Sequence, residues 1–359
     1  MIKILVVEDS GVIRDLLVYL LETDPAMKVV GTAANGEEAI AMLESIQPDV
    51  ITMDINMPKM DGFEATRQIM ESNPKPIVIV TGSWNPQEVN TSFRAVEAGA
   101  VAVIKTPPGS DHPEHAALAQ ELIRTVKTMA EVKVVRRWAH MRTHAGNGAE
   151  TNTVPPTAPA QPKSRIHPLR LVAIGTSTGG PMALQSLLAA LPPDFPLPVV
   201  VVQHMAAGFV GGFAAWLAQS TGHQVHVATD GESLLPGHIY IAPDGFQMKM
   251  AARGKIALTT DGAENGLVPS VSCLFRSVAD MYGAQAVGIL LTGMGRDGAA
   301  ELKLMHDQGA ITFAQDKESS VVHGMPGEAI RLNAATYVLA PDRIAAVLVS
   351  LINQQPSSV

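Results

Sequence analysis

Short all-apolar runs alternate with amphipathic stretches over most of this 359-residue chain. Strands that are covered on both faces of a parallel sheet are apolar throughout, whereas half-exposed strands alternate apolar and polar residues. Runs of the first kind, separated by segments of helical length and period, predict repeated βα units. The chain is therefore expected to be an α/β protein built from doubly wound parallel sheets.

The first 124 residues hold five such runs with helical patterns between them. The predicted strands are Ile2–Val7, Val29–Ala33, Val50–Met53, Ile77–Val80 and Val101–Ile104. The clearest helical patterns are Val12–Leu21, Glu37–Ile46 and Gln87–Ala98. Five βα units of this size predict one flavodoxin-like domain over residues 1–124.

Residues 125–168 differ from the rest in composition. A basic run from Lys133 to Arg142 precedes a stretch rich in proline, threonine and alanine with almost no large apolar residue. Such a stretch is typical of an extended linker. The βα pattern resumes at Leu169, so residues 169–355 are expected to form a second, Rossmann-like domain. Its predicted strands are Leu171–Ile174, Val199–Val202, His238–Ile241, Lys255–Leu258, Ala286–Leu291, Ile311–Ala314 and Tyr337–Leu339.

Composition excludes several classes of protein. The net charge of -8 provides no general attraction for nucleic acid. Cys273 is the single cysteine, which excludes an intrachain disulfide and a cysteine zinc cluster and suggests a buried structural thiol. No apolar stretch approaches the roughly 18 residues that a membrane span needs, and no signal peptide is recognisable. A soluble, cytoplasmic protein is expected.

Charged and polar residues follow four strands of the first domain. Glu8 and Asp9 follow the first strand and Asp54 the third, while Thr81 and Lys105 end the fourth and fifth. The carboxyl ends of parallel strands face one crevice, where three carboxylates would need a hard cation such as Mg²⁺. An acyl-phosphate on Asp54 could then be bridged by Mg²⁺ and Lys105, with Thr81 donating to a phosphoryl oxygen. Polar residues begin loops in every parallel sheet, but this combination favours a phosphorylation site.

These residues stand in segments that resemble the receiver domain of two-component response regulators. The segments are Val6–Ser10, Met53–Gly62, Thr81–Ser83 and Lys105. The resemblance implies Asp54 as phosphoacceptor, Glu8 and Asp9 as metal ligands beside it, and a histidine kinase as phosphodonor. The sequence departs from the family at Ala102, where an aromatic switch residue is frequent, and at Thr106, which separates Lys105 from the usual proline.

A glycine-rich turn follows the first strand of the second domain. Residues 175–179 fit Gly-x-Ser-x-Gly and are followed by Pro181, a pattern that exposes Ser177 at a helix start, where free amides can bind developing negative charge. A dinucleotide-binding loop has similar glycines but requires an acidic residue at the end of the second strand. Gln203 and His204 stand there instead, and a histidine suits a general base.

A nucleophile–base pair needs a third group to orient the imidazole. Asp297 follows another predicted strand and is the leading candidate. By position alone, Asp230, Asp244 and Asp316 stay open as alternatives. The remaining candidates for the base are His223, His226 and His238, which are weaker because they lie at expected loops or strand edges.

Residues 169–355 resemble the catalytic domain of CheB-type chemotaxis protein-glutamate methylesterases. The segments that carry the resemblance are Ile174–Pro181, Gln203–Met205, Ile241–Pro243, Leu291–Gly298 and Gly324–Pro326. The resemblance implies a Ser177 nucleophile, a His204 base and an Asp297 orienting acid. It also points to the Met294 backbone amide, with Thr178 nearby, as support for the oxyanion. Thr176 and Ala206 are departures at positions where the family often has alanine and proline.

The same resemblance implies an activity and its control. A phosphorylated receiver would release the hydrolysis of glutamate methyl esters on chemoreceptors, with methanol as product and no cofactor in the esterase domain. The same acyl chemistry would allow glutamine deamidation. Two hypotheses from other classes are an inactive hydrolase-like domain that only binds partners and a nucleotide-binding oxidoreductase. A DNA-binding output is not expected, because the second domain has no helix-turn-helix pattern or basic stripe.

Overall fold

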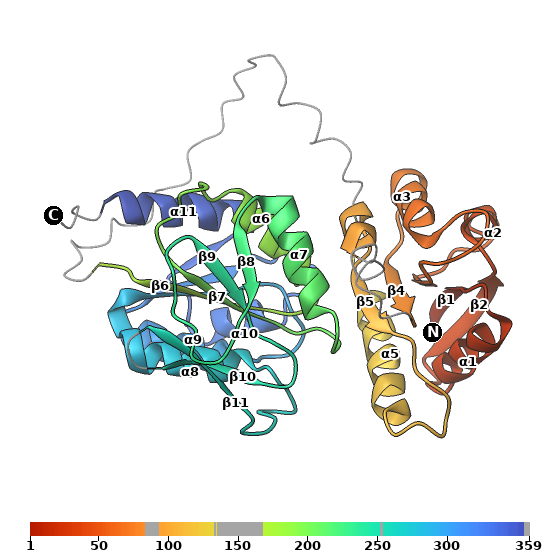
Figure 1. The fold of residues 1–359 in the computed structure, drawn as a ribbon. Coiled ribbons are helices and arrows are strands. Elements are labelled where there is room, and N and C mark those ends of the chain that lie inside the picture. The colour runs from red at the N-terminus through yellow and green to blue at the C-terminus, as the bar shows by residue number, and fades with distance from the viewer. Residues whose placement is uncertain (83–92, 133, 135–167, 252–253, 355–359) are drawn as a thin grey trace, which may run out of the picture.

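The chain forms two α/β domains, which lie side by side in Figure 1. The computed structural model describes residues 1–82, 93–132, 134, 168–251 and 254–354. Each domain is built on an all-parallel main sheet with helices on both faces. This confirms the predicted fold class, and each predicted strand is present with ends shifted by two residues at most.

Among its described residues, the first domain has a five-stranded sheet in the order β2-β1-β3-β4-β5. Its elements are β1 (Ile2–Val7), α1 (Gly11–Glu22), β2 (Met27–Ala33), α2 (Gly36–Met42), β3 (Val50–Met53), α3 (Gly62–Ser72), β4 (Ile77–Thr81), β5 (Ala102–Lys105) and α5 (His115–Met129). Residues 93–98 are also helical, and the rest of the helix predicted over Gln87–Ala98 lies outside the described residues. Along β1, Ile4 and Val6 face the core under α1 and α5, while Leu5 and Val7 face the opposite core.

Helix α5 extends past residue 124, where the sequence predicts the end of the first domain. Val126 and Met129 are buried in the same core as Leu122, one and two turns further along the helix. Because this apolar face continues at helical spacing, the packed domain continues with it.

The second domain has seven parallel strands in the order β14-β13-β12-β6-β7-β9-β8. The strands are β6 (Leu171–Thr176), β7 (Val199–Gln203), β8 (Gln224–Val227), β9 (His238–Ile241), β12 (Ala286–Leu290), β13 (Ile311–Gln315) and β14 (Tyr337–Leu339). A separate antiparallel pair consists of β10 (Gln247–Ala251) and β11 (Lys255–Thr259). The sequence analysis did not predict β8 or β10, whose polar residues interrupt any apolar run.

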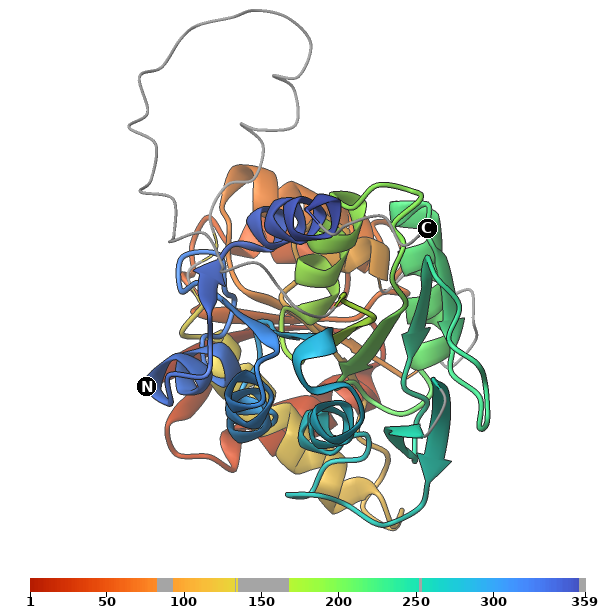
Figure 2. The same cartoon turned by 90° about the vertical axis from the view of Figure 1, so that its left-hand side faces the viewer.

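Helices cover both faces of this second sheet, and Figure 2 shows them in layers above and below it. One face is covered by α6 (Gly180–Ala189), α7 (Val210–Thr221) and α11 (Pro341–Asn353). The other is covered by α8 (Val271–Tyr282), α9 (Ala299–Asp307) and α10 (Met325–Arg331). Successive strand residues such as Ala173 and Ile174 point into different hydrophobic cores, so both faces of the sheet are buried. No described helix has the length and apolar character needed to span a bilayer.

Both sheets reverse their winding direction next to their first strand. In the first domain the reversal falls between β1 and β3, and in the second between β12 and β6. At such a point the loops that leave neighbouring strands turn to opposite faces and open a crevice at the carboxyl ends. The predicted acidic cluster and the predicted serine site each lie at one of these crevices.

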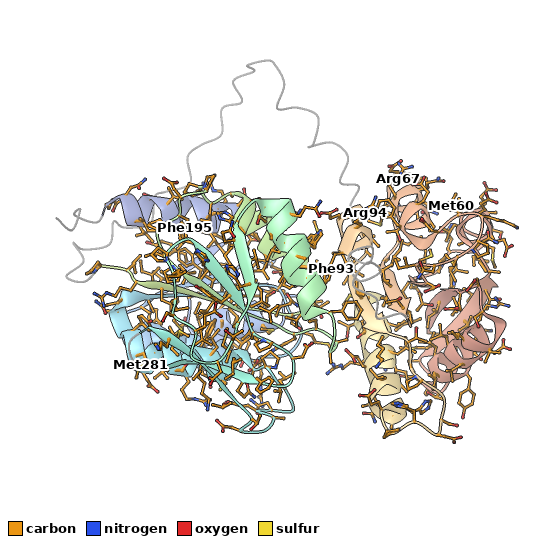
Figure 3. The ribbon with its side chains drawn as sticks, in the orientation of Figure 1. Met60, Arg67, Phe93, Arg94, Phe195 and Met281 are labelled. Atoms are coloured by element: carbon orange, nitrogen blue, oxygen red, sulfur yellow. The ribbon has the colours of Figure 1, made fainter. Side chains whose placement is uncertain are left out.

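The two domains touch through an aromatic cluster. Phe93 of the first domain packs on Phe213 and Trp216 of α7, with ring centroids 5.3 and 5.4 Å apart. Phe209 meets the same ring edge-on at 6.4 Å. The indole of Trp216 donates to Glu97 Oε1 at 2.8 Å. Figure 3 labels Phe93 at this boundary. A ring that is 3% exposed therefore belongs to the core of the neighbouring domain.

Candidate functional sites

The three carboxylates of the first domain converge. Oxygen atoms of Glu8, Asp9 and Asp54 all lie within 4.8 Å of one another. Burial, and then the charge of Asp54, raises the pKa of Glu8 to about 7. Oxygen ligands crowded in this way fit Mg²⁺, whose charge would remove the repulsion between them. The donor set therefore fits the cation that the sequence predicts.

The loop after β3 holds Asp54 by close backbone packing. The amide of Asn56 donates to Asp54 Oδ2 at 3.2 Å, and the amide of Gly62 donates to the Ile55 carbonyl at 2.9 Å. A Cβ atom on Gly62 would lie only 1.9 Å from the Asp54 carbonyl oxygen. Only glycine fits there, so this packing explains why the segment Met53–Gly62 ends in glycine.

Thr81 and Lys105 end neighbouring strands and are register partners. Thr81 is buried, and the Lys105 ammonium lies 3.4 Å from a carboxylate oxygen of Glu114, the residue before α5. Thr81 and Lys105 stand at the carboxyl ends of β4 and β5, at the same edge of the sheet where Asp54 follows β3. Sequence reasoning missed Glu114, because a contact across a nine-residue loop leaves no periodic signal.

The serine turn is shaped by two glycines that cannot be replaced without movement. β6 ends at Thr176, and the Ser177 amide donates to the Thr292 carbonyl at 3.0 Å. Gly179 has φ +77, and a Cβ there would lie 2.5 Å from Val321. A Cβ on Gly180 would lie 2.0 Å from Gln203 Oε1. Helix α6 starts directly after this turn with no side-chain cap. The Gly180 amide donates to the Ser177 carbonyl at 2.9 Å, and Pro181 has no N–H.

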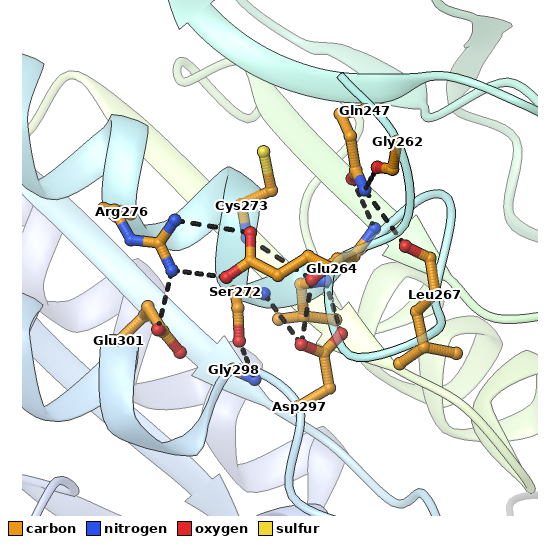
Figure 4. A network of polar contacts seen from close by, with 12 residues as sticks. Gln247, Gly262, Glu264, Leu267, Ser272, Cys273, Arg276, Asp297, Gly298 and Glu301 are labelled. Atoms are coloured by element: carbon orange, nitrogen blue, oxygen red, sulfur yellow. Dashed lines mark hydrogen bonds and ion pairs between the residues drawn. The ribbon is translucent and has the colours of Figure 1, made fainter. Parts of the chain in front are cut away.

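His204 and Asp297 form a hydrogen-bonded pair. The imidazole Nε2 lies 3.0 Å from Asp297 Oδ2. Figure 4 shows the Asp297 carboxylate at the start of α8, where it accepts from Ser270 Oγ at 2.9 Å and from the Val271 and Ser272 amides at 2.6 and 3.1 Å. Burial opposes ionisation, but the bonds from His204 and Ser272 bring the pKa of Asp297 down to about 2. Asp297 is therefore an ionised acceptor at neutral pH.

Ser177 and the pair lie in one cavity without a direct hydrogen bond. Among the hydrogen bonds of the described residues, none joins Ser177 Oγ to His204. Their backbones are tied instead by Gln203, which is 3% exposed and donates from Nε2 to the carbonyls of Ser177 and His204, each at 2.8 Å. The sequence pattern places Gln203 before His204 but assigns it no role. Its only signal is its place beside His204.

The loop after β12 lies against the serine turn. Gly293 approaches so closely that a Cβ there would be 2.7 Å from Ser177 Cβ. The Thr292 hydroxyl lies 2.9 Å from the Thr178 carbonyl oxygen and accepts from the Val322 amide at 2.9 Å. Met294 is the next residue along this loop and lines the same cavity as Thr178. The two residues predicted to support an oxyanion are thus on adjoining loops.

The receiver-type domain forms part of the cavity wall. The cavity measures about 1250 Å³ and is lined by Ser177, His204, Met294 and Asp297 on one side. Residues Glu121, Arg124 and Thr125 of α5 line it from the other domain. One turn further along α5, the hydroxyl of Thr128 contacts Met294 Sδ at 3.2 Å. Access to the serine site therefore depends on the position of the first domain.

The other candidates for the general base and the orienting acid form contacts outside the His204–Asp297 pair. His223 contacts the Leu188 carbonyl, and His226 stacks on His238 at the sheet edge. Asp230, Asp244 and Asp316 each accept from a backbone amide, from Leu258, Gly208 and Ser319 respectively. Cys273 is 6% exposed and burial raises the pKa of its thiol, as expected of a structural residue.

The two domains are those of a response regulator whose receiver domain precedes a hydrolase-type domain. The response regulator receiver domain matches residues 4–117, and the CheB methylesterase family matches residues 172–348. The chain belongs to the CheB methylesterase family.

Two relatives are similar to this chain over nearly its full length. A protein-glutamate methylesterase/protein-glutamine glutaminase of Nitrosospira multiformis is 56% identical over 355 residues, which is 99% of this chain and 98% of that protein. One from Geobacter metallireducens is 51% identical, over 98% and 99% of the two chains. The solved catalytic domain of Thermotoga maritima CheB methylesterase is 38% identical and covers 51% of this chain and 98% of its own, with a TM-score of 0.49.

Proposed function

We propose that this chain is a phosphorylation-activated protein-glutamate methylesterase that hydrolyses glutamate methyl esters on chemoreceptors and deamidates receptor glutamines. The observation that carries the proposal is the hydrogen bond between His204 and the buried Asp297 in the cavity of Ser177. Support comes from relatives named protein-glutamate methylesterase/protein-glutamine glutaminase, which match 98% or more of the chain. Hydrolysis of this ester serves adaptation in chemotaxis signalling.

The proposed reaction uses Ser177 as nucleophile and His204 as general base. Because Nε2 faces Asp297 at 3.0 Å, the nitrogen left for the serine proton is Nδ1. Ser177 Oγ attacks the γ-carbonyl carbon, and the proton passes to the imidazole and then to the departing methoxide, so methanol leaves. Water loses a proton to the same nitrogen and attacks the acyl carbon; the bond from that carbon to Ser177 Oγ breaks, Oγ takes the proton back from the imidazole, and the glutamate leaves. For glutamine, ammonia leaves instead of methanol.

Asp297 serves as the orienting acid in this proposal. Its four hydrogen bonds fix the carboxylate, and its low pKa keeps it ionised next to the imidazolium that forms during each proton transfer. The oxyanion would be held by the Met294 backbone amide, with Thr178 at the start of α6 beside it. The esterase reaction so described requires no cofactor.

The receiver would be phosphorylated on Asp54 by a histidine kinase. Glu8, Asp9 and Asp54 would hold Mg²⁺, and their crowded oxygens support that assignment. Bound there, Mg²⁺ supplies positive charge that neutralises the incoming phosphoryl oxygens. Thr81 and Lys105 would contact the phosphoryl group from the ends of β4 and β5. For Lys105 to do so, the phosphoryl group must compete with the Glu114 carboxylate for the Lys105 ammonium.

Control would follow from the packing of the two domains. In the arrangement described here, α5 and the ring of Phe93 hold the receiver over the cavity, so a receptor helix cannot enter. Phosphorylation can shift the equilibrium between packed and open arrangements only through contacts that differ between them. The linker would begin after Met129, and the esterase domain would occupy residues 169–355.

The partners implied are the methylated cytoplasmic parts of chemoreceptors and a histidine kinase, so we infer that the protein acts in the cytoplasm. No nucleic acid partner is implied.

The test is methanol release from methylated chemoreceptor membranes, with and without a small-molecule phosphodonor and Mg²⁺. We expect release that rises with phosphodonor, no release from Ser177→Ala, and no stimulation of Asp54→Ala. Full stimulation of Asp54→Ala would refute the control model. Absence of release both with and without phosphodonor would refute the esterase assignment.

A further inference from the structure

The loop between β11 and α8 carries a tight turn to the edge of the serine cavity. The amide of Glu264 donates to the Leu267 carbonyl at 3.1 Å, and the amide of Leu267 donates to the Glu264 carbonyl at 3.0 Å. Asn265 and Gly266 between them have φ of 53 and 81. Asn-Gly with two positive φ angles is the preferred sequence of a two-residue hairpin turn. The turn is therefore a defined structure, and Asn265 and Leu267 both line the cavity.

The buried amide of Gln247 ties this turn from inside. Gln247 is 1% exposed. Its Nε2 donates to the carbonyls of Gly262 and Leu267 at 3.1 and 3.0 Å, and its Oε1 accepts from the Ser270 amide at 2.8 Å. Figure 4 shows these bonds converging on Gln247. One side chain thus fixes the start, the turn and the end of the loop.

Arg276 of α8 ties the same turn from outside. Its guanidinium makes two hydrogen bonds to the carboxylate of Glu264 and a third, at 3.0 Å, to Glu301 of α9. Figure 4 shows Arg276 between the two acids. A partly exposed ion pair contributes little to overall stability. A two-bond fork does fix geometry, however, and here it fixes the residue that opens the turn.

The loop is also hydrogen-bonded to the catalytic pair. Its last residue, Ser270, donates from Oγ to Asp297 Oδ1 at 2.9 Å. The turn is therefore held at a set position relative to the reacting centre. The Ser177, His204 and Asp297 chemistry makes no use of Asn265, whose exposed amide can both donate and accept hydrogen bonds.

We propose that the turn Glu264–Leu267 is a substrate-positioning element for the receptor helix. Asn265 hydrogen-bonds a polar group beside the methylated glutamate, and Leu267 packs on the neighbouring apolar surface. Gln247 and Arg276 are positioning residues that hold the turn in place. The inference rests on the proposed function, since it concerns how that protein substrate is held. A small ester carries no receptor helix to place against the turn, so only the protein substrate gains from this contact.

The test compares two substrates with the full-length, phosphodonor-activated protein. Methanol release from methylated receptor membranes gives kcat and KM for the protein substrate, and p-nitrophenyl acetate reports the turnover of a small ester. Asn265→Gly keeps the positive φ and removes only the amide. Glu264→Gln weakens the outer tie. Glu301→Gln is the matched control, because it weakens the contact of Arg276 with Glu301 in the same way and leaves the pair with Glu264.

Losing one hydrogen bond predicts a KM for receptor that is roughly threefold to tenfold higher in Asn265→Gly. The same direction is expected in Glu264→Gln. In both variants kcat for receptor and small-ester turnover should stay within about twofold, and Glu301→Gln should match the unsubstituted protein.

Unchanged receptor KM in both variants would overturn the inference. Equal loss on both substrates would also overturn it, since the loop would then act only through Asp297. If the unsubstituted protein cleaves the small ester but releases no methanol from receptors, the proposed function itself fails, and this result is distinct from the other two.

Discussion

Replacing Phe93 with alanine should activate the esterase without phosphorylation. Phe93 makes three ring contacts with the second domain, at 5.3, 5.4 and 6.4 Å between centroids. Each such pair contributes roughly 0.5–1.5 kcal/mol beyond simple burial, so their loss weakens the packed arrangement by about 2–4 kcal/mol. At about 1.4 kcal/mol for each factor of ten, the open fraction relative to packed rises roughly 30- to 1000-fold.

The size of the effect on activity depends on the starting equilibrium. From a packed-to-open ratio of about 100 to 1, a shift of this size leaves between about a quarter and nine tenths of the molecules open. The assay is methanol release from receptor membranes without phosphodonor, and the expected result is activity approaching that of the phosphorylated, unsubstituted protein.

A matched control separates release of the interface from general loosening of the receiver. Phe63 lies in the same domain, where Arg94 packs over its ring at 4.6 Å; Figure 3 labels Arg94 beside Phe93. Phe63→Ala should leave the activity without phosphodonor low. If Phe93→Ala also stays low while it remains folded, the aromatic cluster does not hold the receiver over the cavity, and the reasoning is wrong.

Three further predictions follow from the two sites. Gln203→Leu removes the hydrogen bonds to the carbonyls of Ser177 and His204. In steady-state kinetics it should lower kcat for receptor on the order of 10- to 100-fold, with KM nearly unchanged. An equal effect on KM would argue against a positioning role. The pKa of Asp297 is lowered from 3.8 to about 2. Its ionised form therefore contributes about 2 kcal/mol to the free energy of unfolding, which is present above pH 4 and is lost as pH falls toward 2. Denaturant unfolding between pH 2 and 5 should show a free energy of unfolding that depends less on pH in Asp297→Asn. Mg²⁺ should raise the melting temperature of the first domain by relieving the repulsion among Glu8, Asp9 and Asp54, and calorimetry that finds the same increase in a Glu8→Gln, Asp9→Asn double variant would contradict the assignment of the metal site.

The sequence predicted the elements that have a strong local pattern. Apolar strands such as β1 and β7 match their predicted bounds within one residue. Strands β8 and β10 were missed because they lie at the sheet edge or in a separate hairpin and mix polar with apolar residues. Helix α11 was missed although Pro341 in its first turn and its apolar face are recognisable signals.

By itself, the sequence determined that the chain has two α/β domains and that chemistry-bearing residues follow their strands, because burial on two faces and the turn requirements of glycine are local constraints. It left open which aspartate meets His204. The tertiary structure decided this, because β12 pairs with β6, so the loop that carries Asp297 leaves from the strand next to that of Ser177. The donors to Asp297 come from α8, and the receiver wall of the cavity comes from α5. Such contacts join residues far apart in the chain, and they depend on strand order and domain packing, which no local pattern encodes.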